Sequence, residues 1–466
     1  MFRIFNEYLS IRLAILFVAE TFLLIFTLAL TAFLRAGKAG ALSAFGTVGG
    51  LARAIVMTLI CQVCFYFNDL YDLRVARQRE EVMVRLLQAF AMACFLMAAL
   101  FYIDPRLDVF QGAFIATMML YLVVVVAWRI LFRKFSKSKV FRVRTLIVGS
   151  GEVARNCVRE IIERDELGLQ IIGFVDNTKS IKIGTSLVNP KLIGTIDELV
   201  EIVEENQVDK IIVAMEDRRH AMPYEALLDL KFRGIIIEDV NSVYEKMTGK
   251  IYVGNLSPSW LIFSDGFKKS RILMFGKRVF DIGLSLLGVM VCFPLALLIA
   301  ALIKLDSKGP IVFVQERVGQ NGDIFNIMKF RSMRYNAEED TGPVWAQDVD
   351  ERVTRVGRFL RLFRLDELPQ FINVLRGDMS FVGPRPERSY FVEQLKEAIP
   401  YYAQRHSVKP GITGWAQVRY KYGASVNDSL EKLQYDLFYI KNMSLLFDLA
   451  ILLLSIKIVI SGKGAK

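Results

Sequence analysis

Long apolar runs dominate the first third of the chain. Four of them approach the roughly 20 residues that cross the hydrocarbon core of a membrane as a helix. They lie at residues 13–34, 45–67, 86–103 and 109–131. The first run is too long for a cleaved signal peptide, and a second run soon follows it. The pattern therefore predicts a bundle of four transmembrane helices over residues 1–135.

Basic residues set the orientation of this predicted bundle. Lys and Arg gather after the second and fourth runs, whereas the turn between runs three and four holds only Arg106. Because short cytoplasmic loops carry the excess of Lys and Arg, we expect both ends of the bundle in the cytoplasm. Glu20 and Arg53 lie inside apolar runs, where an interhelical or interfacial role is favoured over a transport path.

The pattern then changes to short apolar strands that alternate with amphipathic helices. Strands are predicted at 145–148, 170–175, 210–215 and 235–240. Thr195 and Glu198 suit a capping box, and Gly234 suits the end of the last helix. The alternation predicts a parallel, Rossmann-like α/β domain over 142–248, followed by a linker over 249–270.

A glycine-rich turn follows the first of these strands. Gly149 and Gly151 precede a helix, and Asp176 ends the second strand. The turn suits a nucleotide pyrophosphate at a helix N-terminus, with Asp176 holding the ribose. A tight strand-to-helix turn that binds no ligand explains the same residues equally well, so both interpretations stay open.

A fifth apolar run, at 279–303, contains Asp281 and Pro294. Basic residues flank both of its ends, which favours the cytoplasm for both. Proline kinks a helix because it removes a backbone hydrogen bond. We therefore predict a re-entrant helix that breaks at Pro294 and enters one leaflet, with a full fifth span as the alternative. The chain ends in an amphipathic stretch at 438–460 that suits the membrane surface.

The composition agrees with a multi-domain membrane protein, because 53 % of the 466 residues are apolar. The 59 Lys and Arg against 48 Asp and Glu give a net charge of +11. This excess lies beside apolar runs, which favours anionic lipid rather than nucleic acid as the partner. Five scattered Cys indicate reduced thiols, and only two His argue against a multi-His metal centre.

Two adjacent carboxylates, Asp366 and Glu367, stand at a predicted helix start. Pro369 fits the first turn of a helix, where its missing N–H is not needed, so a helix is predicted over 366–376. Its buried stripe should consist of Leu368, Phe371, Ile372 and Leu375. The helix dipole and nearby arginines favour the ionised form of Asp366, which can cap the helix or attack phosphorus. Spacing alone favours the cap with an ion pair.

Basic residues surround this pair in the sequence. Lys329 and Arg331 share one short stretch, and Arg361 and Arg364 immediately precede the carboxylates. Arg385 stands between two prolines, where a stiff backbone suits a guanidinium that recognises phosphate. A structural arginine in a turn is the alternative for Arg385. A later glycine-rich loop also offers backbone N–H groups to anions.

These segments together resemble a known family. The residues that carry the resemblance are Lys277–Asp281, Lys329–Met333, Leu365–Gln370, Arg376–Pro386 and Lys409–Val418. In combination they are similar to the bacterial sugar transferases, the polyprenyl-phosphate hexose-1-phosphate transferases. The predicted spans and Rossmann-like domain ahead of them resemble the long form of that family. The resemblance implies a mainly α catalytic domain over 271–466 that contains the re-entrant helix.

The resemblance also implies a reaction and a location. A UDP-sugar and undecaprenyl phosphate would give undecaprenyl-diphosphate sugar and UMP, the initiating step of exopolysaccharide or O-antigen synthesis. The protein would lie in the bacterial inner membrane, in contact with membrane lipid, with the catalytic domain on the cytoplasmic face. A homodimer is a further expectation.

Residue roles follow from the same resemblance. Asp366 would be the nucleophile that forms a covalent phospho-sugar intermediate, and Glu367 would bind Mg²⁺. The expected phosphate-binding residues are Lys329, Arg331, Arg361, Arg364 and Arg385. The family's re-entrant helix usually breaks at Ser-Pro, and Phe293 stands in place of that serine here. The bend therefore depends on Pro294 alone.

Two other functions are alternatives to this one. A membrane-anchored, NAD-dependent sugar-nucleotide dehydratase normally needs Tyr-x-x-x-Lys, and none of the sixteen Tyr has Lys at that spacing. A non-catalytic, nucleotide-sensing membrane scaffold would not need the intact pair of Asp366 and Glu367. Both are disfavoured.

Overall fold

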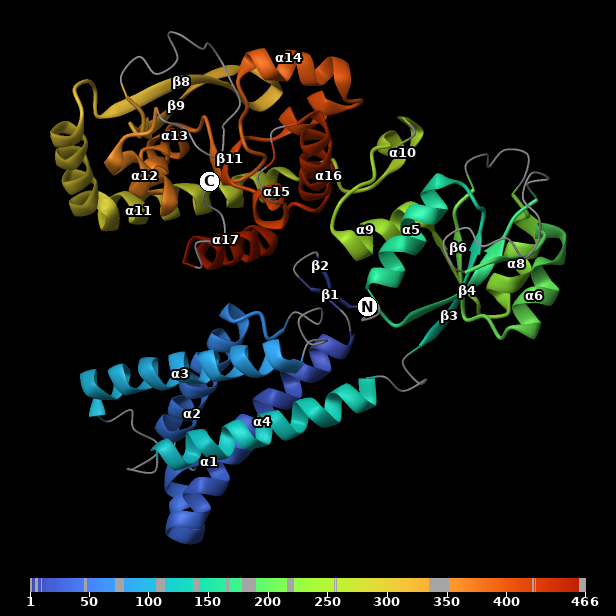
Figure 1. Cartoon of the computed structure of the whole chain (residues 1–466), viewed down its shortest axis with the longest axis horizontal. Coiled ribbons are helices and arrows are strands. Elements are labelled where there is room, and N and C mark those ends of the chain that lie inside the picture. Colours follow the sequence, from blue (N-terminus) through green and yellow to red (C-terminus); the bar gives the residue numbers. More distant parts are fainter. Residues whose placement is uncertain are drawn as a thin grey trace. The chain divides into compact units, whose positions relative to one another are not determined.

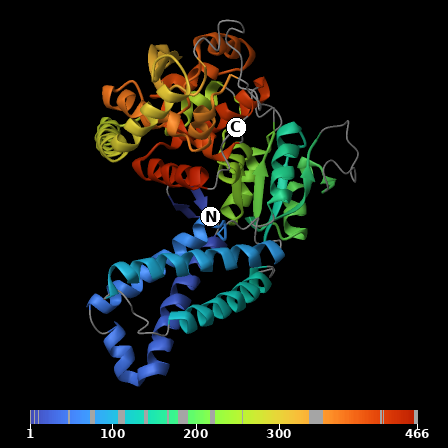
Figure 2. The same ribbon diagram turned by 60° about the vertical axis from the view of Figure 1, so that its left-hand side comes forward.

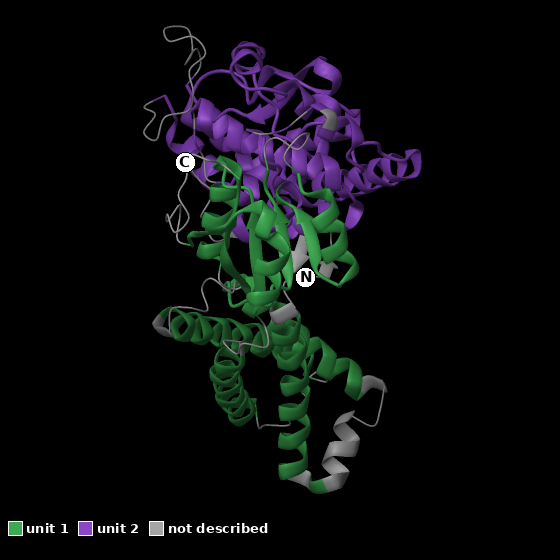
Figure 3. Ribbon diagram, turned by 90° about the vertical axis from the view of Figure 1, so that its right-hand side faces the viewer, with its two compact units in different colours: residues 1–2, 8–240 green, residues 3–7, 241–466 purple. Residues whose placement is uncertain are grey.

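The structure is a computed structural model of the whole chain. It describes residues 2–4, 7–9, 11–45, 48–71, 79–105, 114–136, 142–164, 167–177, 190–215, 222–254, 256, 258–334, 352–420, 423 and 425–460. The chain forms two compact units, residues 1–2 with 8–240 and residues 3–7 with 241–466 (Figure 3). Each unit is described by itself below.

The first unit contains four long apolar helices. Ahead of them in the chain, β1 (Phe2–Ile4) and β2 (Glu7–Leu9) form a two-stranded sheet, of which Arg3, Ile4 and Glu7 are assigned to the second unit. The helices are α1 (Ile11–Phe45), α2 (Val48–Phe67), α3 (Arg79–Ile103) and α4 (Phe114–Ser136). Each contains a segment long and apolar enough to cross a membrane, so the four predicted apolar helices are present. The turn after the third predicted run, with Arg106, lies outside the described residues.

The four helices share one core, to which all of them contribute buried apolar side chains. An ion pair joins the first helix to the last, because Arg129 Nε lies 2.8 Å from Glu20 Oε1 and Glu20 is fully buried. Arg129 also donates to the carbonyl of Leu70, 3.0 Å away. The interhelical role predicted for Glu20 is confirmed, since its partner stands on α4.

The α/β part of this unit holds a five-stranded parallel sheet in the order β5-β4-β3-β6-β7. Its strands are β3 (Val143–Val148), β4 (Leu169–Val175), β5 (Leu192–Gly194), β6 (Lys210–Val213) and β7 (Ile236–Asp239). Its helices are α5 (Glu152–Glu163), η5 (Ile196–Glu198), α6 (Leu199–Glu205) and α8 (Tyr224–Phe232). Helix α5 covers one face, and α6 and α8 cover the other (Figures 1 and 2). This is the Rossmann-like arrangement that the alternation predicts.

Local signals in this domain act as predicted. Thr195 and Glu198 form the capping box at η5. Gly234 follows α8 with a φ of 95°, a backbone conformation that glycine adopts without strain. Helix α9 (Val240–Thr248), predicted as part of the α/β domain, has all but its first residue in the second unit. Its Glu245 pairs there with Lys441 at 2.7 Å.

The second unit is mainly helical, with the antiparallel hairpin of β8 and β9 and two further short strands among its described residues. Its first half comprises α10 (Pro258–Phe263), α11 (Arg271–Asp306), β8 (Val312–Val318), η6 (Gln320–Gly322), β9 (Ile324–Phe330), α12 (Arg355–Leu362), η7 (Leu365–Glu367) and α13 (Gln370–Arg376). Its second half comprises β10 (Ser380–Val382), α14 (Ser389–Ala398), η8 (Tyr402–Ser407), β11 (Gly411–Thr413), α15 (Trp415–Arg419), α16 (Val426–Asn442) and α17 (Leu445–Ile460). Trp415, Phe438 and Phe447 pack together at the centre of its core.

Helix α11 is the apolar helix with the proline. It is the fifth described segment that is long and apolar enough to cross a membrane. The helix continues through Pro294. Its two parts are not collinear, because the end next to β8 turns away from the rest (Figures 1 and 2). A bend has a physical cause here, since the proline ring removes one hydrogen bond and crowds the preceding turn.

The C-terminal stretch differs from the prediction of one amphipathic element at 438–460. Two helices share it, because α16 ends at Asn442 and α17 begins at Leu445. Phe447 and Ile451 of α17 are buried in the core, whereas Leu446 and Leu453 are about half exposed. Helix α17 therefore still presents one apolar face outward.

Candidate active site

The two carboxylates of interest occupy one short 3₁₀ turn. Asp366 and Glu367 lie in η7, and each is only 8 % exposed. Arg364, just before this turn, has a φ of 56°, so the chain reverses sharply there. Pro369 caps α13, which begins one residue later. The predicted helix 366–376 is thus a 3₁₀ turn followed by an α-helix, with the proline at the junction.

The predicted buried stripe of this segment is wrong in part. Ile372 is 42 % exposed, and the buried side chains of α13 are Gln370, Asn373 and Val374. Phe359 and Phe363, on and just after α12, are likewise exposed apolar side chains. Hydrophobic spacing cannot distinguish a side that faces lipid from one that faces a protein core.

Two cations contact Glu367 directly. Arg385 Nη2 lies 2.7 Å from Glu367 Oε1, and Lys329 Nζ lies 3.6 Å from the same oxygen. Burial alone would raise the pKa of the Glu367 carboxyl, but Arg385 and Lys329 lower that pKa to about 2. Glu367 is therefore ionised at any physiological pH.

Asp366 experiences the opposite balance. Burial and the adjacent Glu367 charge raise the pKa of Asp366, although Lys329, Arg385 and Arg361 act against that rise. Burial also disfavours the charged form of Lys329 and lowers the pKa of its ammonium, although the negative charge of Glu367 acts against that shift. The two neighbouring carboxylates thus have pKa values displaced in opposite directions, an arrangement that is frequent in active sites.

The structure brings together most of the basic residues that the sequence singles out. Arg361 donates through Nε to Ser332 Oγ at 2.9 Å and lies near Asp366. The positive charge of Arg364 lowers the pKa of Glu367. Arg331 is different, because its guanidinium donates to the carbonyls of Lys308 and Ser307 at 2.9 and 2.7 Å. Arg331 secures the chain after α11, and it is not among the side chains gathered at the carboxylates.

A buried asparagine that the sequence analysis missed fixes α13 against the hairpin of β8 and β9. Asn373 Nδ2 donates to the carbonyl of Asn326 at 2.7 Å, and its Oδ1 accepts from the N–H of Met328 at 2.9 Å. Lys329 follows on the same strand. The only signal was an amide side chain beside the predicted apolar stripe of this helix.

The backbone ahead of Arg385 is held by side chains from α11 and α17. Lys277 Nζ lies 2.6 Å from Asp448 Oδ2 and donates to the carbonyl of Val382 at 3.0 Å. Asp281 accepts from the hydroxyl of Ser380 and the N–H of Phe381, both at 3.1 Å. In the sequence Lys277 and Asp281 stand beside and within an apolar run, yet in the structure both are buried and bonded.

The glycine-rich turn of the first unit is arranged differently. Asp176 Oδ2 accepts from the N–H of Ser150 at 2.9 Å and also from its hydroxyl. Gly149 has a φ of 107°, and a Cβ there would lie 2.7 Å from the carbonyl oxygen of Ala214. Close approach of the backbone after β3 to Ala214, directly after β6, therefore explains Gly149, while Gly151 is the N-cap residue of α5. The nucleotide-binding role of this turn stays a prediction.

The donor set at the carboxylates suits a metal ion only in company with a ligand. Within the described residues, no group of three or more His, Cys, Asp or Glu side chains gathers to hold an ion. Mg²⁺ commonly binds one or two carboxylates and completes its shell with water and substrate phosphates. Glu367 with Asp366 fits that pattern, so a divalent ion would arrive with phosphate oxygens.

These features define a class of protein: a membrane protein whose second unit holds paired carboxylates within a ring of cations suited to phosphates. Comparison with known proteins then gives the family. A model of bacterial sugar transferases matches residues 272–462, and a model described as a CoA-binding domain matches residues 66–222. The chain belongs to the bacterial sugar transferase family.

Several relatives have named activities. An Aeromonas hydrophila UDP-N-acetylgalactosamine-undecaprenyl-phosphate N-acetylgalactosaminephosphotransferase is 42 % identical over 55 % of this chain and 60 % of its own length. An undecaprenyl-phosphate glucose phosphotransferase of Komagataeibacter xylinus is 35 % identical over 69 % of this chain and 60 % of its own length. The UDP-glucose:undecaprenyl-phosphate glucose-1-phosphate transferase of Escherichia coli K12 is 35 % identical, over 62 % of each chain. The matched part thus spans about 60 % of these relatives.

Proposed function

We propose that this protein transfers a sugar phosphate from a UDP-sugar to undecaprenyl phosphate, giving undecaprenyl-diphosphate sugar and UMP. The observation that carries the proposal is the buried pair of Asp366 and Glu367, with Arg385 2.7 Å and Lys329 3.6 Å from Glu367. Both substrates are phosphate esters, and such a ring of fixed cations stabilises their charge. The relatives' names support the same reaction.

Asp366 is the nucleophile in this proposal. Its carboxylate oxygen attacks the phosphorus that bears the sugar, and the bond from that phosphorus to the bridging oxygen of UDP breaks to release UMP. A phosphate oxygen of undecaprenyl phosphate then attacks the same phosphorus and releases the Asp366 carboxylate. Glu367 is held by two cations, so Asp366 is the carboxylate left available for attack.

The basic side chains around the carboxylates have the proposed role of binding phosphate. Lys329, Arg361, Arg364 and Arg385 bind and orient the phosphates and offset the charge that gathers on the phosphoryl oxygens. Glu367 is the proposed protein ligand for Mg²⁺, which when bound would neutralise diphosphate charge.

The contacts that hold the two ends of α11 support a re-entrant placement of this helix. Near its start, Lys277 donates a hydrogen bond to the carbonyl of Val382, and Asp281 accepts one from the N–H of Phe381. At its other end, Ile303 packs with Phe330 and Leu360, and Asp306 accepts from the N–H of Val356 at 3.2 Å. One folded domain thus holds both ends, which argues against their lying on opposite sides of a membrane.

The same geometry suggests where the reaction occurs. A lipid phosphate stays at the membrane surface while a UDP-sugar is soluble, so a helix that enters and leaves on one side would hold the carboxylates at that boundary. We propose the bacterial inner membrane as the location, with the catalytic domain on the cytoplasmic face. A homodimer remains part of the proposal and follows from the family resemblance.

A direct assay tests the function. The full-length protein, purified in detergent or nanodiscs, is incubated with undecaprenyl phosphate, Mg²⁺ and a panel of UDP-sugars that includes UDP-glucose and UDP-N-acetylgalactosamine. Release of UMP that depends on the lipid, together with lipid-linked sugar, is the expected result. No UMP release with any UDP-sugar would contradict the proposal and favour a non-catalytic scaffold.

A further inference from the structure

The backbone that carries Arg385 is bonded at four successive carbonyls. Pro384 O accepts from the N–H of Gly411 at 2.9 Å, and Glu387 O accepts from the N–H of Val318 at 2.9 Å. Between them, Arg405 Nη2 lies 3.0 Å from Arg385 O, and Arg317 Nη1 lies 3.2 Å from Pro386 O. Because the two prolines also fix their own φ angles, this segment has little freedom to move.

Among these bonds, the one to the carbonyl of Arg385 comes from the guanidinium of Arg405. Arg405 is only 5 % exposed. Its Nε donates to Asp436 Oδ2 at 3.0 Å, and its Nη1 donates to the hydroxyl of Tyr402 at 2.7 Å. Asp436 is on α16, while Arg405 and Tyr402 are on η8. The guanidinium reaches these three partners from three separate nitrogens in one plane, whereas an ammonium has a single nitrogen.

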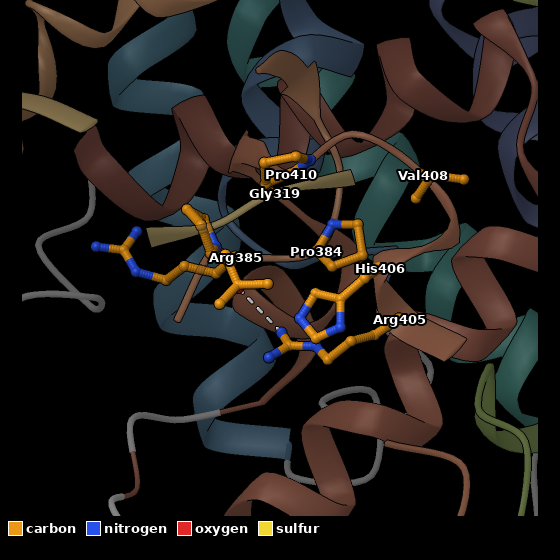
Figure 4. Close-up of a pocket in the computed structure, with 9 residues that line it drawn as sticks. Gly319, Pro384, Arg385, Arg405, His406, Val408 and Pro410 are labelled. Carbon is orange, nitrogen blue, oxygen red and sulfur yellow. Dashed lines mark hydrogen bonds between the residues drawn. The ribbon is translucent and has the colours of Figure 1, made fainter. Parts of the chain in front are cut away.

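Arg385 connects this buried cluster to the carboxylates. Figure 4 shows Arg405 bonded to the main chain of Arg385, while the Arg385 guanidinium points away from Arg405. That guanidinium contacts Glu367 Oε1 at 2.7 Å. A continuous series of bonds thus runs from Asp436 through Arg405 and Arg385 to Glu367.

We propose that Arg405 is a positioning residue for Arg385, with Asp436 and Tyr402 holding Arg405 in place. The proposal rests on the proposed function, because it assigns Arg405 to the binding of the donor's phosphates through Arg385. Arg405 acts on the backbone of Arg385 and does not itself touch Glu367. Its loss should therefore matter only as long as the Arg385 guanidinium is present.

A double-mutant cycle tests this dependence. Arg405→Lys keeps a positive charge for Asp436 but loses the fork that also reaches the Arg385 carbonyl. We expect this variant to lower kcat/KM about 10²-fold, since small misplacements of a binding group carry costs of that size. In an Arg385→Ala background the same substitution should cost less than about threefold. The exposed Arg419→Lys is the matched control and should leave turnover unchanged.

The affinity for UDP, measured by calorimetry, gives a readout that does not require turnover. Arg405→Lys and Arg385→Ala should each weaken UDP binding about tenfold, and the double variant should bind no more weakly than Arg385→Ala. If wild-type protein binds UDP but turns over no UDP-sugar, the proposed function fails while this cycle still reports on Arg405. Equal losses in both backgrounds, or no loss in either, would overturn the role of Arg405.

Thermal unfolding separates positioning from a general loss of structure. If Arg405→Lys does not fold, Tyr402→Phe removes one of the three contacts and keeps the ion pair with Asp436. We then expect Tyr402→Phe to weaken UDP binding severalfold in the wild type and to have no effect in Arg385→Ala. A Tyr402→Phe protein that binds UDP as wild type does would contradict the proposal.

Discussion

Two arginine–carboxylate pairs in the second unit have the same chemistry and very different surroundings. Arg405 and Asp436, 2.8 Å apart, are 5 % and 2 % exposed. Arg385 and Glu367, 2.7 Å apart, are 25 % and 9 % exposed. The first pair is closed to solvent and joins η8 to α16. The second opens towards solvent on the side of Arg385, where a ligand can reach it.

Charge balance separates the pairs further. One cation meets one carboxylate in the closed pair, with the Tyr402 hydroxyl as a neutral third partner. At the open pair, Lys329 adds a second cation to Glu367, and Arg361 lies near Asp366. A buried arginine pair therefore does not by itself mark an active site; partial exposure together with surplus cations does.

The largest effect is expected at the nucleophile. Asp366→Asn keeps the size of the side chain but removes the attacking charge, so turnover should fall at least about 10³-fold. UMP release from matched amounts of folded protein measures the effect, and the thermal unfolding midpoint is the control. Near-normal UMP release by Asp366→Asn would refute its assignment as nucleophile.

The second-largest effect on turnover is expected at Arg385. Arg385→Ala removes a fixed donor from the phosphates and should cost about 10² to 10³-fold in kcat. Arg385→Lys keeps the charge without the two-pronged geometry, so an intermediate loss is expected. Steady-state kinetics with varied UDP-sugar distinguish these cases. Equal activity of Arg385→Ala and wild type would mean that the open pair is structural, like the closed one.

The two carboxylates should separate activity from stability. Asp436→Asn leaves Arg405 buried without its counter-charge and should reduce the free energy of unfolding by about 3–5 kcal/mol. Glu367→Gln, in the more open pair, should change stability much less and yet lower kcat about 10²-fold. Chemical denaturation and turnover of both variants check this reversal. If Glu367→Gln proves the more destabilising of the two, the open pair is the one that stabilises the fold, contrary to this expectation.

A smaller effect should appear in the pH dependence. Burial and the Glu367 charge raise the pKa of Asp366, and only its ionised form attacks. As pH falls, kcat/KM should therefore decline above the ordinary aspartate pKa of about 3.9. Glu367→Gln removes the like charge, so the decline should move to lower pH in its residual activity. A shift to higher pH would contradict this electrostatic account.

Sequence information sufficed where the chemistry is local. The carboxylates, Arg361 and Arg364 are neighbours in the chain, and the apolar runs correspond to helices in the structure. Arg331, expected from the resemblance to bind phosphate, lies apart from the carboxylates, because β9 ends at Phe330 and its guanidinium is bonded to the carbonyls of Lys308 and Ser307. Arg405 and Asp436 were missed because their pairing is a tertiary contact, to which no local pattern points.

Capture of the covalent intermediate tests the central claim most directly. The wild-type protein is incubated with a UDP-sugar that it turns over and without undecaprenyl phosphate, and its peptides are analysed by mass spectrometry. The account predicts a gain of one sugar phosphate on Asp366 that disappears when the lipid phosphate is added. Turnover of the same UDP-sugar with no adduct on Asp366, or with an adduct on another residue, would contradict it.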